Sequence, residues 1–352
     1  MNKVKKTLFI GVALILAISC VLAGCSTSGP APTKENPLVL RWVAAGPAAG
    51  VFWELMETYS KKIEDRTEGR VDVELYPAGA LCEPLEIPEA LKTGVADIGF
   101  VHPSFIAGEL PKTELLMIPF VFPVGEARIK MNEELMPKYL APEWESVGIK
   151  MMLPYTGGNS RQAFSKIPIR SMEEFKGVKI AATSGIAAKA LELVGFSPVN
   201  MPGQETYLAL EKGVIDAATQ WFWSADQSKY QEVCSYVTMI DLTADEYFGW
   251  AMNPDTLKDL PSDIKKIVEE EIYAAGESYE TDQVKWDEEA KQRFLDAGIE
   301  IITLTPQEHE IMKQSAQPLV EEWIATQEKA GMKDAREYAE YCLKLRDKYE
   351  GK

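Results

Sequence analysis

A single helical stretch limits the folds open to this chain. About 35 residues, from Ser262 to Ala297, contain no proline and carry a helical pattern. Pro261, Ser262 and Asp263 form a typical helix start, and Gly298 is a typical helix end. Apolar residues recur through the stretch at roughly helical spacing, namely Ile264, Ile267, Val268, Ile272, Tyr279, Val284, Trp286 and Phe294. Such a helix is long for one globular domain, so we expect it to pack against two.

Strand and helix patterns alternate ahead of this stretch. Residues 38–44, 71–76 and 97–101 have the composition and alternation of strands, and residues 51–66 and 86–92 have the periodicity of helices. This β-α-β-α-β order is typical of a sheet with helices on its faces. At 352 residues the chain can also bury two cores, so we predict an α/β fold with two domains.

The rest of the chain continues the pattern. Two amphipathic helices are expected at its end, and the apolar but irregular residues 111–123 are expected to cover the core rather than to form a site. Further helices are predicted at 126–136 and 186–194. Further strands are predicted at 147–154, 162–164, 178–182, 197–201, 235–240, 247–253 and 299–303.

The N-terminus has the features of an export signal. Basic residues precede an apolar run at 8–22, and the run ends in Val-Leu-Ala-Gly-Cys25, which resembles the lipobox of bacterial lipoproteins. We expect cleavage after residue 24 and lipid on Cys25, although an ordinary cleaved signal or an uncleaved anchor is the alternative. Residues 25–37 are rich in Ser, Pro, Thr and Gly, so we expect a flexible tether.

Charge and composition exclude several classes of function. The formal net charge is −17, which argues against nucleic-acid binding, because phosphate recognition needs a basic surface. His102 and His309 are the only histidines, so a histidine-based zinc site or a Ser-His-Asp triad is poorly supplied. Three cysteines follow the lipobox and allow at most one disulfide, namely Cys82, Cys234 and Cys342.

One stretch, from 155 to 223, has the features of half a ligand-binding cleft. The strand at 178–182 leads through a Thr-Ser-Gly turn into a helix, and ligands bind near such turns in α/β sheets. Arg161 follows a Thr-Gly-Gly turn, and the stretch closes on the aromatic residues Trp221 and Trp223. A cation with aromatic walls suits a small anion with an apolar body. The alternative is a surface arginine and a buried aromatic cluster.

Six segments, in this order and spacing, carry a resemblance to a known family. The chain resembles, from about 38 to 345, the extracytoplasmic solute receptors of tripartite ATP-independent periplasmic (TRAP) transporters, the DctP-like family. The segments that carry the resemblance are KIEDRTEGRVDVELYPAG at 62–79, LKTGVADIG at 91–99, IPFVF at 118–122, SMEEFKGVKI at 171–180, VNMP at 199–202 with YLALEKGVID at 207–216, and MN at 252–253 with LP at 260–261.

This resemblance implies a two-lobed fold of the periplasmic-binding-protein type (type II), with a long helix bracing both lobes. It also implies closure of the lobes over one small molecule, most often an organic acid, and delivery of that molecule to a TRAP membrane permease. No catalytic residue and no cofactor is implied. The expected divisions are a signal peptide at 1–24, a tether at 25–37, lobe I at 38–157 plus 247–285, and lobe II at 158–246 plus 286–345.

The chain departs from the family at the usual anion anchor. The resemblance puts an arginine two residues beyond Lys179, but Ala181 occupies that position. A second arginine of the family is kept as Arg161. Some members of the family hold a metal with a glutamate near this site, but the corresponding residues 216–220 end without a second carboxylate, so we expect no metal.

Further residues are expected to contact the ligand. Phe52 (or its neighbour Trp53) offers stacking surface, and His102 follows a predicted strand, although a loop histidine with its own partners is an equal alternative. Ser184 lies beside a helix N-terminus. The complete predicted set is Arg161, Trp221, Trp223, His102, Phe52, Tyr155, Ser184 and Gln220.

Two other functions remain open from the sequence. The same fold can serve as a ligand sensor or scavenger, a difference that cleft residues do not reveal. An exported hydrolase is disfavoured, because the sequence contains neither a Gly-x-Ser-x-Gly motif nor a His-Glu-x-x-His motif.

Overall fold

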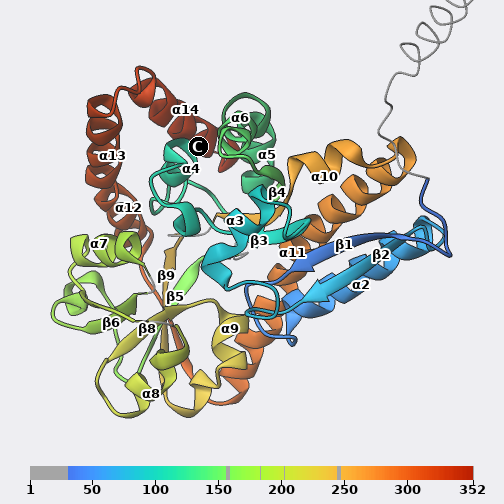
Figure 1. The fold of residues 1–352 in the computed structure, drawn as a ribbon. Coiled ribbons are helices and arrows are strands. Elements are labelled where there is room, and N and C mark those ends of the chain that lie inside the picture. The colour runs from blue at the N-terminus through green and yellow to red at the C-terminus, as the bar shows by residue number, and fades with distance from the viewer. Residues whose placement is uncertain (1–30, 156–158, 183, 202, 244–246, 352) are drawn as a thin grey trace, which may run out of the picture.

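The computed structural model describes residues 31–155, 159–182, 184–201, 203–243 and 247–351, without the side chains of 153–155 and 204. The predicted signal peptide and Cys25 lie outside the described residues. Two mixed sheets, each covered by helices, form two lobes (Figure 1). The predicted α/β class and two-lobed fold are confirmed.

The sheet of lobe I has five strands in the order β2-β1-β3-β10-β4. The first three strands of this order are parallel, and β10 runs antiparallel to both of its neighbours. The bounds of the strands are β1 Leu38–Val43, β2 Val71–Tyr76, β3 Ile98–Val101, β4 Lys150–Tyr155 and β10 Phe248–Met252.

The sheet of lobe II has six strands in the order β11-β9-β5-β8-β6-β7. Strand β5 is antiparallel to both of its neighbours, whereas β6 is parallel to both β8 and β7. The bounds are β5 Arg161–Ser165, β6 Lys179–Ala182, β7 Ser197–Asn200, β8 Ala217–Gln220, β9 Tyr236–Leu242 and β11 Glu300–Thr303.

The helices cover both sheets and form an arm at the C-terminal end (Figure 1). In lobe I they are α2 Val51–Arg66, α3 Ile87–Lys92, α4 Pro111–Leu115, α5 Gly125–Leu135, α6 Ala141–Ser146 and α10 Pro254–Asp259. In lobe II they are α7 Gly185–Leu193, α8 Thr206–Glu211 and α9 Phe222–Gln227. The spanning helix is α11 Ser262–Asp296, and the arm consists of α12 Pro306–Ser315, α13 Gln317–Lys329 and α14 Ala335–Tyr349.

Helix α11 is shared by the cores of the two lobes. It has 35 residues, so it is about 52 Å long. Ile264 and Ile272 in its first half belong to the core around β1, β10 and α2, whereas Ala290 and Phe294 in its second half belong to the core around β5, β8 and α9. The predicted helix that packs against two domains is therefore confirmed.

A buried ion pair also ties α11 to lobe I. The guanidinium of Arg128 in α5 lies 3.3 Å from the carboxylate of Glu280 in α11, and both side chains are less than one tenth exposed. The Nε of Arg128 donates to the carbonyl oxygen of Pro123. Removing one partner of a buried pair leaves an uncompensated charge, so this contact fixes the position of α11 on α5.

The C-terminal arm contacts both lobes. Glu308 in α12 accepts a hydrogen bond from the backbone N–H of Met172 in lobe II. In contrast, the indole of Trp323 in α13 donates to the carbonyl oxygen of Pro111, and the hydroxyl of Tyr341 in α14 donates to Glu134 in α5. The predicted lobe boundaries stay a prediction, and these contacts favour grouping α13 and α14 with lobe I.

Some predicted elements differ from the structure. Three helices rather than two finish the chain, because Ala316 and the turn at 330–334 interrupt what the periodicity alone suggests. Residues 111–123 do cover the core, but they begin with the short helix α4, which Pro111 starts at a position where proline is favoured. The short elements β8, α8, α9 and α10 have no counterpart among the predicted ones.

A close backbone approach fixes β3 on α3. A Cβ added at Gly99 would lie 2.6 Å from the Cγ2 of Ile87, which is fully buried in α3. We expect Gly99→Ala to lower the free energy of unfolding by about 1–3 kcal/mol, because the overpacked helix must shift. Urea unfolding followed by circular dichroism measures this change.

Gly185→Ala is the matched control. No atom lies within 4 Å of the Cβ position at Gly185, and the residue opens helix α7, where alanine is the better helix former. This variant should be as stable as the parent or slightly more so. Equal losses in both variants would show that the contact of Gly99 with Ile87 is not what limits substitution.

Candidate functional site

The two lobes face each other along the sheet edges where the chain crosses between them. The chain leaves lobe I at the end of β4, enters lobe II at Arg161, and returns from Leu242 at the end of β9 to Phe248 at the start of β10. Val101 pairs next to Phe248, and Gln220 pairs next to Arg161. The ends of β3 and β10 in lobe I and of β5, β6 and β8 in lobe II therefore border one interlobe cleft.

Arg161 lies at this edge and stacks on an indole ring. Arg161 is only 7% exposed, and its Cζ lies 4.2 Å from the ring centroid of Trp221. The rings of Trp221 and Trp223 are stacked in turn, with centroids 5.9 Å apart. The contact with Trp221 uses the face of the guanidinium, and a guanidinium binds carboxylates through the N–H groups in its plane.

An aromatic wall continues from these tryptophans across α11 into lobe I. Trp223 contacts Trp286 at 6.5 Å between centroids, and Trp286 contacts Tyr279 at 6.0 Å, both edge to face. Tyr279 stacks on Phe52 at 4.5 Å. The predicted residues Phe52, Trp221 and Trp223 thus belong to one continuous wall, and its two α11 members are residues that the sequence identified only as helix periodicity.

His102 extends the same wall on the side of lobe I. Its ring stacks near Phe248, with centroids 6.2 Å apart. Its Nδ1 accepts a hydrogen bond from the backbone N–H of Ser104 and lies 2.7 Å from the Ser104 hydroxyl. In a neutral imidazole this arrangement places the proton on Nε2.

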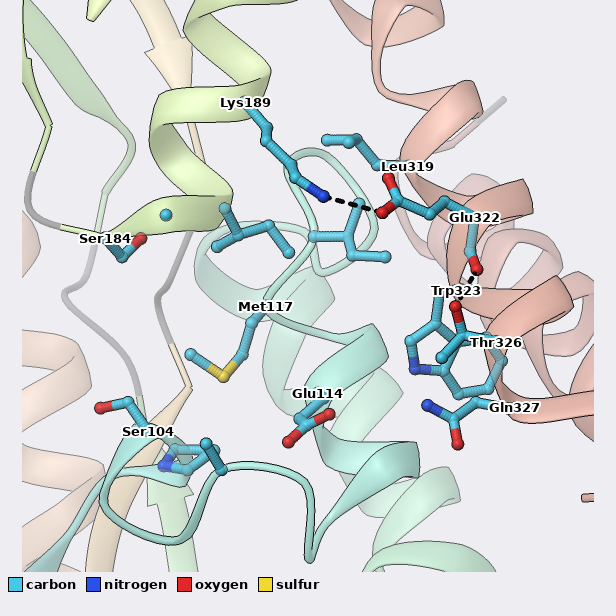
Figure 2. A pocket seen from close by; sticks show the side chains of 15 residues that line it. Ser104, Glu114, Met117, Ser184, Lys189, Leu319, Glu322, Trp323, Thr326 and Gln327 are labelled. Atoms are coloured by element: carbon cyan, nitrogen blue, oxygen red, sulfur yellow. Dashed lines mark hydrogen bonds and ion pairs between the residues drawn. The ribbon is translucent and has the colours of Figure 1, made fainter. Parts of the chain in front are cut away.

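The remaining predicted site residues, Ser184, Gln220 and Tyr155, have three different surroundings. The Ser184 hydroxyl caps α7 by accepting from the N–H of Ala187, and the residue lines an open pocket between the lobes (Figure 2). The Oε1 of Gln220 accepts from the N–H of Trp221, so this side chain supports the tryptophan. Tyr155 pairs with Phe248 at the cleft edge, but its side chain lies outside the described residues.

The pocket beside Ser184 has a volume of about 490 Å³. Met117 and Ile118 line it from lobe I, Ile186 from α7, and Leu319 and Trp323 from α13 (Figure 2). Ser104, which contacts His102, also lines it. The pocket is therefore lined by both lobes and contacts the residue pair Ser104 and His102.

The structure places Ala181, where the resemblance implies an arginine, in the core of lobe II. The residue is 2% exposed and belongs to a buried apolar cluster that also contains Phe164 and Phe222. Its carbonyl oxygen accepts a hydrogen bond from the Thr219 hydroxyl. Position 181 is thus part of the core under α9, and it offers an anion nothing but apolar surface.

The sequence analysis missed Asp287, which holds the tryptophan segment in place. Its carboxylate accepts a hydrogen bond of 2.9 Å from the N–H of Trp223, at the start of α9, and the residue is 3% exposed. Burial raises the pKa of Asp287 to about 6, although hydrogen bonds from Trp223, Asn159 and Phe222 oppose the shift. Its spacing from Tyr279 and Phe294 puts it on the buried face of α11, and that position was the available signal.

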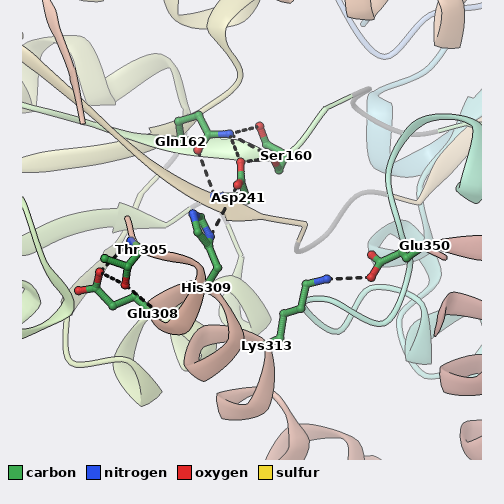
Figure 3. Close-up of polar contacts among 8 residues, drawn as sticks. All are labelled: Ser160, Gln162, Asp241, Thr305, Glu308, His309, Lys313 and Glu350. Atoms are coloured by element: carbon green, nitrogen blue, oxygen red, sulfur yellow. Dashed lines mark hydrogen bonds and ion pairs between the residues drawn. The ribbon is translucent and has the colours of Figure 1, made fainter. Parts of the chain in front are cut away.

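A second polar network joins the two crossings between the lobes. The carboxylate of Asp241 accepts hydrogen bonds of 2.9 Å from the Ser160 hydroxyl and from the amide of Gln162 (Figure 3). Asp241 has a φ of 48°, an uncommon conformation for a residue that is not glycine. Its N–H donates to Gln162 in return, and His309 of α12 lies 3.7 Å away. These contacts fix the backbone beside Arg161.

The described residues contain no cluster of three or more His, Cys, Asp or Glu side chains arranged to hold a metal ion. Cys82, Cys234 and Cys342 are free thiols. In the described part of the chain, no helix combines the length and the apolar character needed to cross a membrane.

Comparison with known proteins gives a consistent result. Residues 47–327 match the sequence profile of DctP, the bacterial extracellular solute-binding proteins of family 7. The chain is 28% identical over 318 residues to the C4-dicarboxylate-binding periplasmic protein DctP of Rhodobacter capsulatus, covering 87% of this chain and 90% of that protein. It is 24% identical to the sialic acid-binding periplasmic protein SiaP of Vibrio cholerae, covering 74% of this chain and 80% of the relative.

Solved structures show the same fold. A TRAP periplasmic solute-binding protein from Desulfovibrio salexigens superposes with a TM-score of 0.76 at 27% identity, covering 90% of this chain and 97% of that one. A TRAP solute-binding protein from Rhodoferax ferrireducens, in complex with copurified benzoate, superposes with a TM-score of 0.76 at 23% identity, covering 89% and 99%.

The buried carboxyl of Asp287 makes stability depend on pH. Its folded pKa of about 6 lies above the ordinary 3.8, so the folded state binds this proton more tightly than the unfolded chain. Protonated Asp287 therefore makes its full contribution to the free energy of unfolding below about pH 4. This contribution falls by up to about 3 kcal/mol as the pH rises through about 6. Asp287→Asn, which keeps an acceptor for Trp223, should remove this fall.

Urea unfolding at pH 4, 5, 6 and 7 checks the effect. The control is Glu289→Gln, an exposed carboxyl on the same helix, which should retain the parent's pH profile. Identical profiles for the parent and Asp287→Asn would mean that the carboxyl of Asp287 is not the titrating group.

Proposed function

Because this chain belongs to the DctP family of bacterial extracellular solute-binding proteins, and is thus an extracytoplasmic receptor for a TRAP-type permease, we propose that Arg161 and the aromatic wall hold its organic-acid ligand between the lobes. The observation that carries this proposal is the stacking of Arg161 on Trp221 at the cleft edge. In a chain of net charge −17, an anion needs such a local, oriented cation. The stacked rings then supply apolar surface for the rest of the ligand.

Capture follows from the way the lobes are joined. Ligand groups that contact both Arg161 in lobe II and His102 in lobe I do so only when the lobes approach each other. Such contacts favour the closed population by their differential free energy. The Asp241 network keeps Arg161 in place during the motion.

The proposal extends to the rest of the predicted site. Phe52, Trp221 and Trp223 form the wall, His102 borders the cleft from lobe I, and Ser184 lines the pocket beside α7. Gln220 acts through the backbone of Trp221, and Tyr155 stays a candidate by its place at the edge. No catalytic residue, cofactor or metal is assigned, and the role is capture rather than turnover.

The proposed anchor to the membrane is a lipid on Cys25, so that the receptor stays on the outer face of a cell membrane or in the periplasm. The lipobox-like sequence before Cys25 and the tether after it support this role. The proposed lobes are 38–157 with 247–285, and 158–246 with 286 onward up to α12, whereas α13 and α14 join lobe I.

Arg161→Ala should abolish binding of acids. Removing a guanidinium from a desolvated site loses at least one charge-assisted hydrogen bond pair, so we expect affinity to fall about 100-fold or more. The measurement is isothermal titration calorimetry on the soluble form starting at Ser26, with benzoate, phenylacetate, galactonate and succinate as probes.

Arg170→Ala is the matched control, because Arg170 is exposed and pairs with Glu300 on the surface of lobe II. It should bind the same acids as the parent. An Arg161→Ala protein that folds normally and keeps its affinity within threefold would show that Arg161 is structural and that the anchor lies elsewhere.

Cys25→Ser tests the lipid anchor. In bacteria that produce the full precursor, the parent should partition with membranes and the variant should be released in soluble form. Fractionation followed by mass spectrometry of the N-terminal peptide measures both properties. A parent protein that is cleaved but carries no acyl chain would contradict the assignment.

A further inference from the structure

The pocket between the lobes has an apolar lining that the anion anchor does not use. We name it the α7–α13 groove and define it by Met117, Ile118, Ile186, Leu319 and Trp323. We propose that this groove takes the apolar arm of the ligand while Arg161 holds the carboxylate. The solute is then an amphipathic monocarboxylate, with an aryl or alkyl arm, and not a small dicarboxylate. This inference rests on the proposed function.

The distance between the two ends follows from the sheet order. Arg161 starts β5, Ser184 follows the end of β6, and β8 lies between these strands, with Gln220 opposite Gln162. Two strand spacings are about 10 Å. A ligand with its carboxylate at Arg161 therefore extends its apolar arm toward the groove, and each added methylene up to phenylpentanoate carries the arm further into it.

The groove and the aromatic wall belong to one cleft. Ser104 lines the groove and contacts His102, whose ring lies on Phe248 beside the wall. These contacts connect the groove to the residues of lobe I at the cleft edge. Lobe I, α7 of lobe II and α13 all line the groove, so closing the lobes would wrap a bound arm (Figure 2).

The charged groups at the rim already have partners. Lys189 forms a 2.8 Å ion pair with Glu322, and Glu114 accepts from the N–H of Gly108. The indole N–H of Trp323 donates to the carbonyl oxygen of Pro111. Among the described residues that line the groove, Lys189 is the only cation and it is paired, so a second carboxylate would instead meet Glu114 and Glu322. The rim therefore selects against dicarboxylates.

The test is a chain-length series measured by isothermal titration calorimetry: benzoate, phenylacetate, phenylpropanoate, phenylbutanoate and phenylpentanoate, each beside a dicarboxylate of similar length. Burial of a methylene is worth about 0.8 kcal/mol, so affinity should rise about three- to fourfold per methylene for the monocarboxylates. The dicarboxylates should show no such rise.

Two variants of α7 make the result specific. Ile186→Glu places a charge on the half-buried wall of the groove and should remove the rise. Leu193→Glu makes the same change on the same helix at an exposed position, and should keep the rise. A rise that survives Ile186→Glu overturns the assignment of the groove.

The outcomes separate this inference from the proposed function. A flat series in the parent, with benzoate binding that still requires Arg161, overturns the groove as the arm's site and leaves the anion anchor standing. Failure of every acid, benzoate included, to bind the parent overturns both.

Discussion

Helix α11 is the constraint on which the rest of the structure depends. Its first half is buried in the core of lobe I and its second half in the core of lobe II, so neither core is complete without it. The Arg128–Glu280 ion pair and the ring contacts of Tyr279 and Trp286 lie between these halves. Motion of the lobes must therefore bend or rotate about a shared helix, and the cleft has one rigid side.

Helix α11 also positions the residues of the proposed anion site. Asp287 of α11 accepts a hydrogen bond from the N–H of Trp223, and Gln220 accepts one from the N–H of Trp221. These bonds fix the backbone of the two stacked indoles, and the Arg161 guanidinium lies over the ring of Trp221. A guanidinium that is already desolvated and oriented loses little entropy when it binds a carboxylate. Because Ala181 is a buried apolar residue, the proposed binding depends on Arg161 and on apolar area.

Much of the fold could be predicted from the sequence, because the strands alternate clearly and α11 has a long regular period. The elements that were missed are short: β8 and α9 have too few residues for a period to show, and their formation depends on tertiary contacts such as Asp287 with Trp223. Arg161 and the tryptophans could be identified from their types and order. The contacts of Tyr279, Trp286 and Asp287 could not be predicted, since only the packing of α11 across both lobes brings these residues against Phe52 and Trp223.

A crystal structure of the soluble form grown with phenylpropanoate tests the proposed ligand position most directly. We expect one molecule between the lobes. Its carboxylate should lie within hydrogen-bond distance, about 3 Å, of the Arg161 guanidinium, and its ring should point from the aromatic wall toward the α7–α13 groove. A carboxylate bound elsewhere in the cleft, with Arg161 still turned onto Trp221 and touching no ligand atom, would contradict it.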